Sequence, residues 1–287
     1  MIAPESSSKS ITGRETTATG IRLIREAQPP RWKLYALSII CMHGVAGFTG
    51  ALAYSTRLIA KLALRNVSFD IKAGEKVAII GRSGSGKSTL IDLVPRFHDP
   101  TGGTIRIGGY NASDISNESM RAATALISQD VFLFDSTILE NIRDGNAGAS
   151  DEDVERAARR AALTETLGNM PAGLQTVVGP NGSSLSGGQK QRIGIARALV
   201  KDADICVFDE ATSALDVETE KQVLENVTKE LDHKTVLFVT HRPATLDYVD
   251  RILLLDEGRL VSIGTKKELE TGSEQYRALL NIAMKES

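Results

Sequence analysis

The stretch VAIIGRSGSGKST, residues 77–89, decides the fold of this chain. An apolar run leads into a glycine-rich turn and then into Lys87, Ser88 and Thr89, after which residues 90–94 have an apolar helical pattern. The order G-x-x-x-x-G-K-[ST] between a strand and a helix is typical of a loop whose backbone N–H groups converge on phosphate oxygens. The sequence therefore predicts a nucleotide site in an α/β protein with a mostly parallel sheet.

Each residue type in this loop suits that chemistry. Glycines let the backbone curl around phosphate groups, and the helix N-terminus adds partial positive charge. The ammonium of Lys87 is expected to bridge the β- and γ-phosphates, and the hydroxyl of Ser88 to bind Mg²⁺. The residues of the loop expected to contact the nucleotide are Gly81, Ser83, Gly84, Ser85, Gly86, Lys87, Ser88 and Thr89.

Two adjacent carboxylates follow a second apolar strand. Residues 205–208 are apolar and lead into Asp209 and Glu210. Open α/β sheets bind ligands at the carboxyl ends of their strands, so both acids are expected beside the glycine-rich loop. Asp209 is expected to hold the shell of Mg²⁺ and Glu210 to polarise an attacking water, which together indicate nucleotide hydrolysis.

The composition supports a globular protein. Of 287 residues, 41% are hydrophobic and 24% charged, and 34 Lys and Arg against 36 Asp and Glu give a net charge of -2. A near-neutral chain lacks the basic stripe of a nucleic-acid binder, so no nucleic-acid partner is expected. Cys41 and Cys206 are too few for a disulfide framework.

Further strands and helices fit the same architecture. Residues 67–71 alternate in polarity, and residues 236–239 and 252–255 are apolar runs that predict buried strands. Residues 150–163 predict a helix that begins near Ser150, with acidic residues in its first turn. No fixed-period repeat is visible, which excludes solenoids and propellers.

The N-terminal part has a different texture. Residues 1–33 read as a disordered, basic tail, and residues 34–58 as a candidate transmembrane helix, because residues 34–56 contain no Asp, Glu, Lys or Arg. A bilayer core needs about 20 such residues in a helix. A buried helix or a segment that does not insert remains the alternative. If the basic residues before the segment stay in the cytoplasm, a spanning helix places the following domain outside.

Residues 185–192 read LSGGQKQR and resemble the signature sequence of ATP-binding-cassette (ABC) ATPases. Other motifs stand in the order of that family: Gln129, the SALD segment at residues 213–216, and His241. Over residues 62–287 the chain most resembles the nucleotide-binding domain of bacterial lipid and multidrug exporters, with most of the transmembrane domain absent.

This resemblance implies a fold and ligands. The fold is a P-loop NTPase core with an antiparallel β portion and a helical subdomain at about residues 130–200 of the ATP-binding domain. ATP and Mg²⁺ are the implied ligands. The partners are a second ABC ATPase domain, in a homodimer or a heterodimer, and transmembrane transporter domains in the membrane.

A second anion site is expected at the signature sequence, because its first residues open a helix whose N–H groups and dipole point outward. The resemblance implies that this site and the Lys87 loop lie on different faces. Two chains would then meet head to tail with two ATP molecules between them. The expected contacts are Ser186, Gly187, Gly188 and Gln189.

The resemblance also implies roles around the γ-phosphate. Gln129 would contact the metal and the attacking water, His241 would fix the γ-phosphate and orient Glu210, and Asp216 would link the two sites across the dimer. The expected catalytic residues are Lys87, Gln129, Glu210 and His241. The expected metal ligands are Ser88, Gln129 and Asp209.

Two features depart from the family pattern. Exporters of this type usually carry an acidic residue in a Val-Gly-acid-x-Gly segment, whereas residues 178–182 read VGPNG, so Pro180 stiffens the loop without supplying a carboxylate. The aromatic residue that stacks on adenine precedes the phosphate loop by somewhat more than twenty residues in the family. Tyr54 stands at that distance but in an apolar context, so adenine stacking and a membrane-interface position both stay open.

Two functions follow from these observations. The first is the ATP-hydrolysing subunit of an ABC exporter at the inner (cytoplasmic) membrane, with its ATPase domain facing the cytoplasm. The alternative is a non-catalytic nucleotide-binding remnant or interaction module of a truncated transporter. A soluble cassette ATPase of DNA repair or translation is disfavoured, because no coiled-coil arms interrupt the domain and only one cassette is present.

Overall fold

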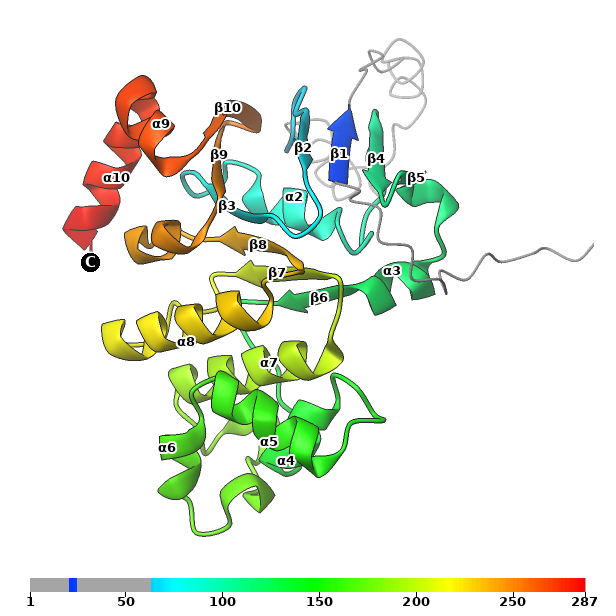
Figure 1. Cartoon of the computed structure of the whole chain (residues 1–287), viewed down its shortest axis with the longest axis vertical. Helices are drawn as coiled ribbons and strands as arrows, with labels where there is room; N and C mark the ends of the chain where they lie inside the picture. The colour runs from blue at the N-terminus through cyan, green and yellow to red at the C-terminus, as the bar shows by residue number, and fades with distance from the viewer. Residues whose placement is uncertain (1–20, 25–62, 287) are drawn as a thin grey trace, which may run out of the picture.

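A computed structural model of the chain describes residues 21–24 and 63–286 (Figure 1). Its centre is a six-stranded sheet with the order β10-β9-β3-β8-β7-β6, in which only β10 runs antiparallel to its neighbour. The strands of this sheet are β3 (Lys76–Ile80), β6 (Thr124–Ile127), β7 (Ile205–Asp209), β8 (Thr235–Val239), β9 (Arg251–Asp256) and β10 (Arg259–Gly264).

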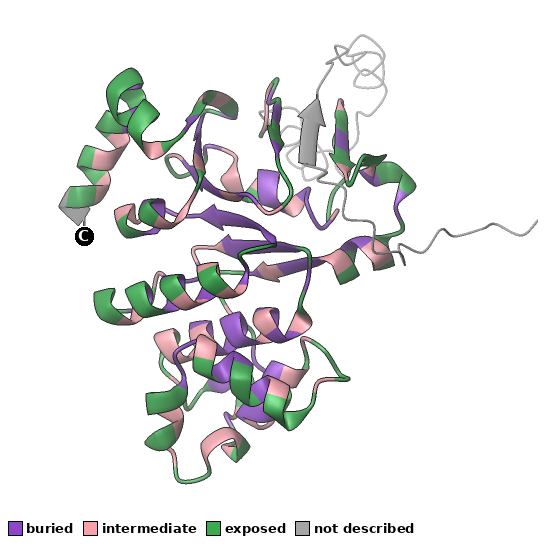
Figure 2. Ribbon diagram, viewed as in Figure 1, coloured by how far each residue is buried: buried purple, intermediate pink, exposed green. Residues whose placement is uncertain are grey.

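The central strands are mostly apolar because helices and loops cover both faces of the sheet, as is usual for parallel strands. All five residues of β8 are buried, as are four of the five in β7 and β3 (Figure 2). Phe208 and Phe238 stack between β7 and β8 with ring centroids 5.0 Å apart. The apolar runs that predicted buried strands at residues 77–80, 205–208, 236–239 and 252–255 are confirmed.

A smaller antiparallel sheet lies beside α2, with the order β2-β1-β4-β5 (Figure 1). Strand β1 lies within residues 1–33, which the sequence assigned to a tail outside the ATP-binding domain of residues 62–287. Leu23 of β1 pairs with Phe69 of β2 on one side and with Ile105 of β4 on the other. The strands are β1 (Ile21–Ile24), β2 (Phe69–Ile71), β4 (Thr104–Ile107) and β5 (Tyr110–Asn111).

The helices fall into two groups. Helices α4, α5 and α6 lie on the far side of α7 from the sheet and form the lower part of the molecule in Figure 1, where the helical subdomain was expected. One core of buried side chains runs from α4 and α5 through α7 to β6, β7 and β8. The first group is α4 (Ile138–Arg143), α5 (Asp151–Arg160), α6 (Thr164–Gly168) and α7 (Gly187–Lys201). The others are α2 (Lys87–Asp92), α3 (Asn117–Ala123), α8 (Val217–Glu230), α9 (Lys266–Gly272) and α10 (Glu274–Glu286).

Helix boundaries follow local capping chemistry. The predicted helix at residues 150–163 is α5, and Ser150 caps it: its hydroxyl accepts from the N–H of Asp153, whose carboxylate accepts from the N–H of Ser150. Short 3₁₀ turns complete the fold: η2 (Ala112–Asp114), η3 (Gly173–Gln175), η4 (Pro180–Gly182) and η5 (Pro243–Tyr248).

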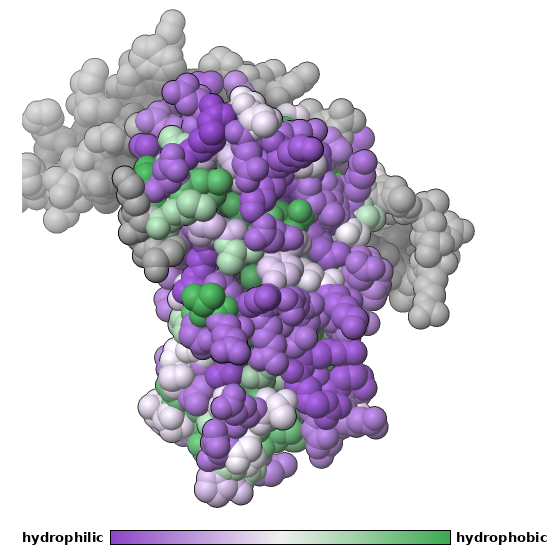
Figure 3. All heavy atoms as spheres, turned by 60° about the vertical axis from the view of Figure 1, so that its left-hand side comes forward, coloured by the Kyte–Doolittle hydropathy of each residue, from purple (hydrophilic) through white to green (hydrophobic). Residues whose placement is uncertain are grey.

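None of the helices in the described part of the chain is both long and apolar enough to cross a bilayer. The face in Figure 3 carries separated hydrophobic patches among hydrophilic side chains. The candidate transmembrane segment at residues 34–58, and Tyr54 within it, lie outside the described residues.

Candidate nucleotide-binding site

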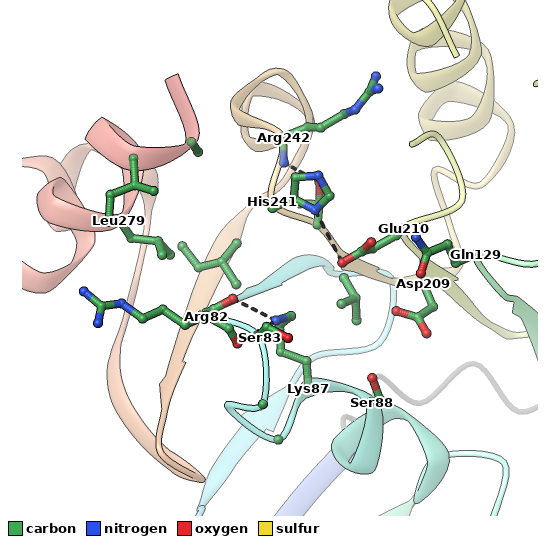
Figure 4. Close-up of a pocket in the computed structure, with 18 of the residues that line it drawn as sticks. Arg82, Ser83, Lys87, Ser88, Gln129, Asp209, Glu210, His241, Arg242 and Leu279 are labelled. Carbon is green, nitrogen blue, oxygen red and sulfur yellow. Dashed lines mark hydrogen bonds and ion pairs between the residues drawn. The ribbon is translucent and has the colours of Figure 1, made fainter. Parts of the chain in front are cut away.

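The polar residues singled out in the sequence come from four neighbouring parallel strands. Strands β3, β8, β7 and β6 end at the same edge of the sheet, and the loops after them carry Lys87, His241, Glu210 and Gln129 in that order. These loops surround an open pocket of about 790 Å³ (Figure 4). The location agrees with the rule that open α/β sheets bind ligands at the carboxyl ends of their strands.

The glycine-rich loop is held in a shape that only glycine permits at two positions. Gly86 has φ 101°, and a Cβ there would lie 2.7 Å from the carbonyl oxygen of Ala63. At Gly81 a Cβ would lie 2.2 Å from the carbonyl oxygen of Leu255. The loop is therefore packed against two other backbone segments, which fixes its curvature before any ligand binds.

Lys87 bridges the two ends of this loop from the inside. Its Nζ donates to the carbonyl oxygens of Gly81 at 2.7 Å and Arg82 at 3.1 Å. Burial lowers the pKa of Lys87 below its usual 10.5, and the carboxylates of Glu210 and Asp209 oppose that shift. A partly buried ammonium held at the centre of an N–H-lined loop is suited to neutralise phosphate oxygens.

The two adjacent acids occupy different environments. Burial raises the pKa of Asp209 above its usual 3.8, and the carboxylates of Glu210 and Asp92 raise it further against the charge of Lys87. Glu210 has φ 49°, in the left-handed region, and its N–H donates to the carbonyl oxygen of Val239 at 2.9 Å. This unusual backbone turns the Glu210 side chain toward the loop after β8.

The Glu210 side chain lies beside His241, the histidine predicted from the sequence. Oε1 of Glu210 lies 3.4 Å from Nδ1 of His241, a contact drawn as a dashed line in Figure 4. The side chain of His241 is 58% exposed and that of Glu210 is 23% exposed. Both groups therefore face the open pocket and are accessible to a ligand and to water.

The pocket contains a donor set that fits Mg²⁺ only together with phosphates. Ser88 and Asp209 both line it, as does Gln129. Within residues 21–24 and 63–286, no group of three or more His, Cys, Asp and Glu side chains could hold a metal ion. Mg²⁺ is usually bound by one or two protein oxygens, with the other positions filled by water and substrate phosphates.

The structure brings some predicted residues together and keeps others apart. The predicted residues that line the pocket are Gly81, Ser83, Gly84, Gly86, Lys87, Ser88, Thr89, Gln129, Asp209, Glu210 and His241. Ser85, which belongs to the same loop, is buried. The signature residues Ser186, Gly187, Gly188 and Gln189, and also Asp216, are not among the residues that line the pocket.

The signature residues and Asp216 instead cap helices. The Ser186 hydroxyl accepts from the N–H of Gln189, whose side chain accepts from the N–H of Ser186, so the two form a capping box at the start of α7. Asp216 caps α8, and hydrogen bonds from Thr219 lower the pKa of its carboxyl. Neither helix start reaches the Lys87 loop of the same chain.

The pocket also has a wall that the sequence did not indicate. This wall is formed by α10, and Leu279 lies on the same side of the pocket as Arg82 in Figure 4. Its residues are Leu279, Leu280, Ile282 and Ala283. The apolar spacing in this helix is a signal for packing and carries no signal for a site.

The segment with Pro180 is tied to the core of the helical subdomain. Val178 donates its N–H to the carbonyl oxygen of Ser136, and Lys190 of α7 donates to the carbonyl oxygen of Asn181 at 2.8 Å. Asn181 has φ 48° inside the short η4 turn. Proline therefore fits this position as the first residue of a 3₁₀ turn.

Known proteins resemble the chain over this part. It is 45% identical over 225 residues to the "ATP-dependent lipid A-core flippase" of Neisseria meningitidis serogroup B, covering 78% of this chain and 36% of that protein. It is 44% identical over 220 residues to the "Beta-(1-->2)glucan export ATP-binding/permease protein NdvA" of Agrobacterium vitis, covering 77% of this chain and 38% of that protein. The chain thus spans less than two thirds of these relatives.

A solved structure also resembles the chain over this part. A bacterial Atm1-family ABC exporter with ATP bound superposes with a TM-score of 0.75 at 41% identity, covering 77% of this chain and 39% of that chain. The P-loop NTPase fold expected from the sequence is confirmed by this likeness. The model of the family described as "ABC transporter" matches residues 64–213. The chain belongs to the ABC transporter family.

Proposed function

We propose that this chain binds and hydrolyses MgATP as the nucleotide-binding subunit of an ABC exporter. The observation that carries the proposal is the single pocket in which Lys87, Ser88, Asp209, Glu210 and His241 meet at the carboxyl ends of neighbouring strands. Membership of a family named for ATP-binding transporters supports ATP as the nucleotide.

The loop and Lys87 would bind the phosphates. The ammonium of Lys87 exchanges its contacts with the carbonyls of Gly81 and Arg82 for the β- and γ-phosphate oxygens. Ser88, Asp209 and Gln129 would hold Mg²⁺, which supplies charge neutralisation at the transferred phosphate. Burial, and after it the carboxylates of Glu210 and Asp92, raise the pKa of Asp209. A bound cation would stabilise its ionised form.

Glu210 would orient the attacking water and accept its proton. The contact of Glu210 with His241 at 3.4 Å supports a shared role, in which His241 fixes the γ-phosphate while it orients the carboxylate. In-line transfer of a phosphoryl group needs positioning and charge stabilisation more than covalent chemistry.

A complete site would need a second subunit. The signature residues 186–189 and Asp216 are remote from the pocket of their own chain, which supports a head-to-tail pair that presents α7 of one chain to the pocket of the other. The first turn of α7 would add N–H groups to the γ-phosphate of the partner. The pair would be a homodimer or a heterodimer.

Transport would require transmembrane domains in addition to this ATPase. The flippase and glucan-export relatives support a place at the inner membrane, with the nucleotide pocket facing cytoplasmic ATP. Closure of the dimer on ATP and reopening after hydrolysis would then drive the transmembrane part. Residues 34–58 remain the candidate membrane segment of this chain.

The test is expression of the full chain, followed by separation of membranes from cytosol and ATPase assays of both fractions. Lys87→Ala is expected to abolish turnover, because it removes the only ammonium that contacts the loop in the described structure. Glu210→Gln is expected to keep ATP binding and to accumulate a closed dimer. Binding of ATP by the wild-type chain without turnover would favour the non-catalytic alternative, and near-normal turnover in Glu210→Gln would remove Glu210 from the catalytic role.

A further inference from the structure

We propose that Gln191 and Arg242 are positioning residues that hold the segment Ser213–Leu215 from two sides and thereby set the positions of the catalytic loops. The inference rests on the proposed ATPase function. Neither side chain was assigned a role from the sequence. Each makes hydrogen bonds that connect parts of the site that are far apart in the chain. These hydrogen bonds fix the positions of the loops that follow β6, β7 and β8.

Gln191 reaches the segment from α7. Its Nε2 donates to the hydroxyl of Ser213 at 2.9 Å, and its Oε1 accepts from the N–H of Ala214 at 2.9 Å. The same Nε2 lies 3.4 Å from the carbonyl oxygens of Gln129 and Glu210. One side chain therefore connects the loop after β6, the loop after β7 and the signature helix.

Because Gln191 is buried, the loss of one of its hydrogen bonds would be energetically costly. The residue is 3% exposed, so water cannot replace a lost partner. An unpaired polar group in such a place costs its full desolvation penalty, which strongly favours the paired geometry. Exposed polar side chains, in contrast, change partners with water at little cost.

Arg242 reaches the segment from a different element, the loop after β8. One guanidinium nitrogen donates to the carbonyl oxygen of Ser213 at 2.7 Å, and the other donates to that of Leu215 at 3.1 Å. Figure 4 shows this guanidinium directed away from Lys87 and Ser88, although the residue lies at the pocket wall. Its place is therefore beside the segment and away from the phosphate loop.

A buried carboxylate fixes Arg242 in turn. Oε2 of Glu220 in α8 accepts from Arg242 at 2.7 Å, and Oε1 accepts from the hydroxyl of Thr212 at 2.7 Å. The Glu220 side chain is 4% exposed. A planar guanidinium with several fixed acceptors has one orientation, which a lysine ammonium cannot reproduce.

We call Gln191 and Arg242 the clamp of the segment Ser213–Leu215. The clamped segment lies between two residues of the proposed mechanism. Glu210 precedes it by three residues and Asp216 follows it directly. His241 adjoins Arg242, and the carbonyl of Gln129 adjoins Gln191. A shift of the segment would therefore move the proposed base, its histidine partner and the residue expected at the dimer interface together, and small shifts of this kind reduce the rate of the chemical step.

The structure supplies matched controls for a purely structural role. Asn141 is a fully buried amide that donates to the carbonyls of Phe134 and Thr137 and accepts from the N–H of Phe134, within the helical subdomain. Arg251 pairs with the largely buried Glu75 and donates to the carbonyl of Asp70, at the opposite end of β3 from the pocket. These two make the same kinds of bond and touch neither the segment nor the pocket lining.

The experiment compares Gln191→Glu with Asn141→Asp, and Arg242→Lys with Arg251→Lys, in the full chain purified in detergent. For each we would measure the kcat and KM of ATP hydrolysis, the Kd of a fluorescent ATP analogue, and the Tm. We expect kcat to fall about tenfold or more in the two clamp variants, with KM and Kd within about twofold of wild type. Both control variants should lower Tm and leave kcat within about twofold of wild type.

A milder variant covers the case in which a clamp variant does not fold. Ser213→Ala removes only the hydroxyl that accepts from Gln191, and we expect a fall in kcat of about threefold at unchanged Kd. Unchanged kcat in the folded clamp variants and in Ser213→Ala would overturn the clamp while leaving the ATPase proposal standing. Equal losses of kcat in clamp and control variants would also overturn it, because they indicate a general effect of stability. A wild-type chain without ATPase activity would instead overturn the proposed function on which the clamp rests.

Discussion

Replacing Gly86 by alanine tests whether the glycine-rich loop is shaped by packing. Gly86 has φ 101°, where an L-residue pays about 1–2 kcal/mol. A Cβ would also lie 2.7 Å from the carbonyl oxygen of Ala63 and 2.8 Å from Cδ2 of Leu64. A flexible side chain can retreat from such a contact, but a backbone oxygen retreats only if its segment moves.

That segment is tied down on its other side. The N–H of Arg65 donates to the carbonyl of Gly258 at 2.6 Å, and the N–H of Gly258 donates to the carbonyl of Ser85 within the loop itself. Overpacking of a fixed site costs about 1–3 kcal/mol. The sum for Gly86→Ala is about 3 kcal/mol after allowance for the smaller entropy of the unfolded alanine chain, which offsets about 0.4–1 kcal/mol.

Gly84→Ala is the matched control in the same loop. Gly84 has φ 76°, but a Cβ there meets nothing within 4 Å. Only the conformational cost remains, and we expect a net loss of about 1 kcal/mol or less.

Urea and thermal unfolding of the nucleotide-free protein measure the difference. At about 2–4 °C per kcal/mol for a domain of this size, Tm should fall by about 6–12 °C in Gly86→Ala and by no more than about 4 °C in Gly84→Ala. Equal losses of stability in the two variants would refute the reasoning, because the clash with Ala63 is the feature that separates them.

Other predictions follow from the carboxylate at the end of β7 and from one tight helix contact. The pKa of Asp209 is raised, so its ionised form is less stable in the folded protein than in the unfolded chain, and this penalty is present above the folded pKa and relieved as pH falls through it. Asp209→Asn is therefore expected to raise the Tm of the nucleotide-free protein while it weakens the dependence of ATPase activity on Mg²⁺. In the wild type, protons compete with Mg²⁺ for Asp209, so the Mg²⁺ concentration for half-maximal activity should increase as pH falls toward that pKa. In Gly145→Ala a Cβ would lie 2.1 Å from the carbonyl oxygen of Arg197, so we expect a loss of about 1–3 kcal/mol in urea unfolding with an unchanged Kd for ATP.

Much of the parallel sheet could be predicted from the sequence, because a strand buried on both faces must be apolar at every position. The run before Gly81 and the runs at β7, β8 and β9 are of this kind. Their carboxyl ends also had to meet at one edge of the sheet, which is why Asp209 and Glu210 could be expected beside the glycine-rich loop.

Strand β1 could not be predicted, because its place depends on distant partners and its own sequence gives no pattern. It has four residues, and its partners β2 and β4 lie more than forty residues further along the chain. Four residues, one of them Arg22, are too few to show a periodicity, and the edges of β2 and β4 specify the place of this strand. A boundary set by the change of composition near residue 62 therefore missed it.

The roles of Gln191 and Arg242 were hidden for a related reason. Both stand next to residues that carry expected chemistry, Gln191 within the signature sequence and Arg242 directly after His241. A motif indicates which residue types occur together. Most hydrogen-bond partners of these two side chains are instead backbone groups: carbonyl oxygens that accept, and the N–H of Ala214, which donates to Gln191. Such contacts depend on where three loops meet in space and leave no compositional mark.

Three unusual features of the described structure lie together in the pocket. Glu210 adopts a left-handed backbone that costs about 1 kcal/mol for a non-glycine residue, burial and the neighbouring carboxylates raise the pKa of Asp209, and burial lowers the pKa of Lys87. The clamp offers a physical reason why this arrangement persists without ligand, since the N–H of Glu210 is bonded to β8 and its carbonyl to Gln191. Because hydrogen bonds hold both the N–H and the carbonyl of Glu210, its backbone cannot relax to a more stable conformation. The carboxylate is therefore already in position before ATP binds, and the binding energy of ATP is not needed to place it.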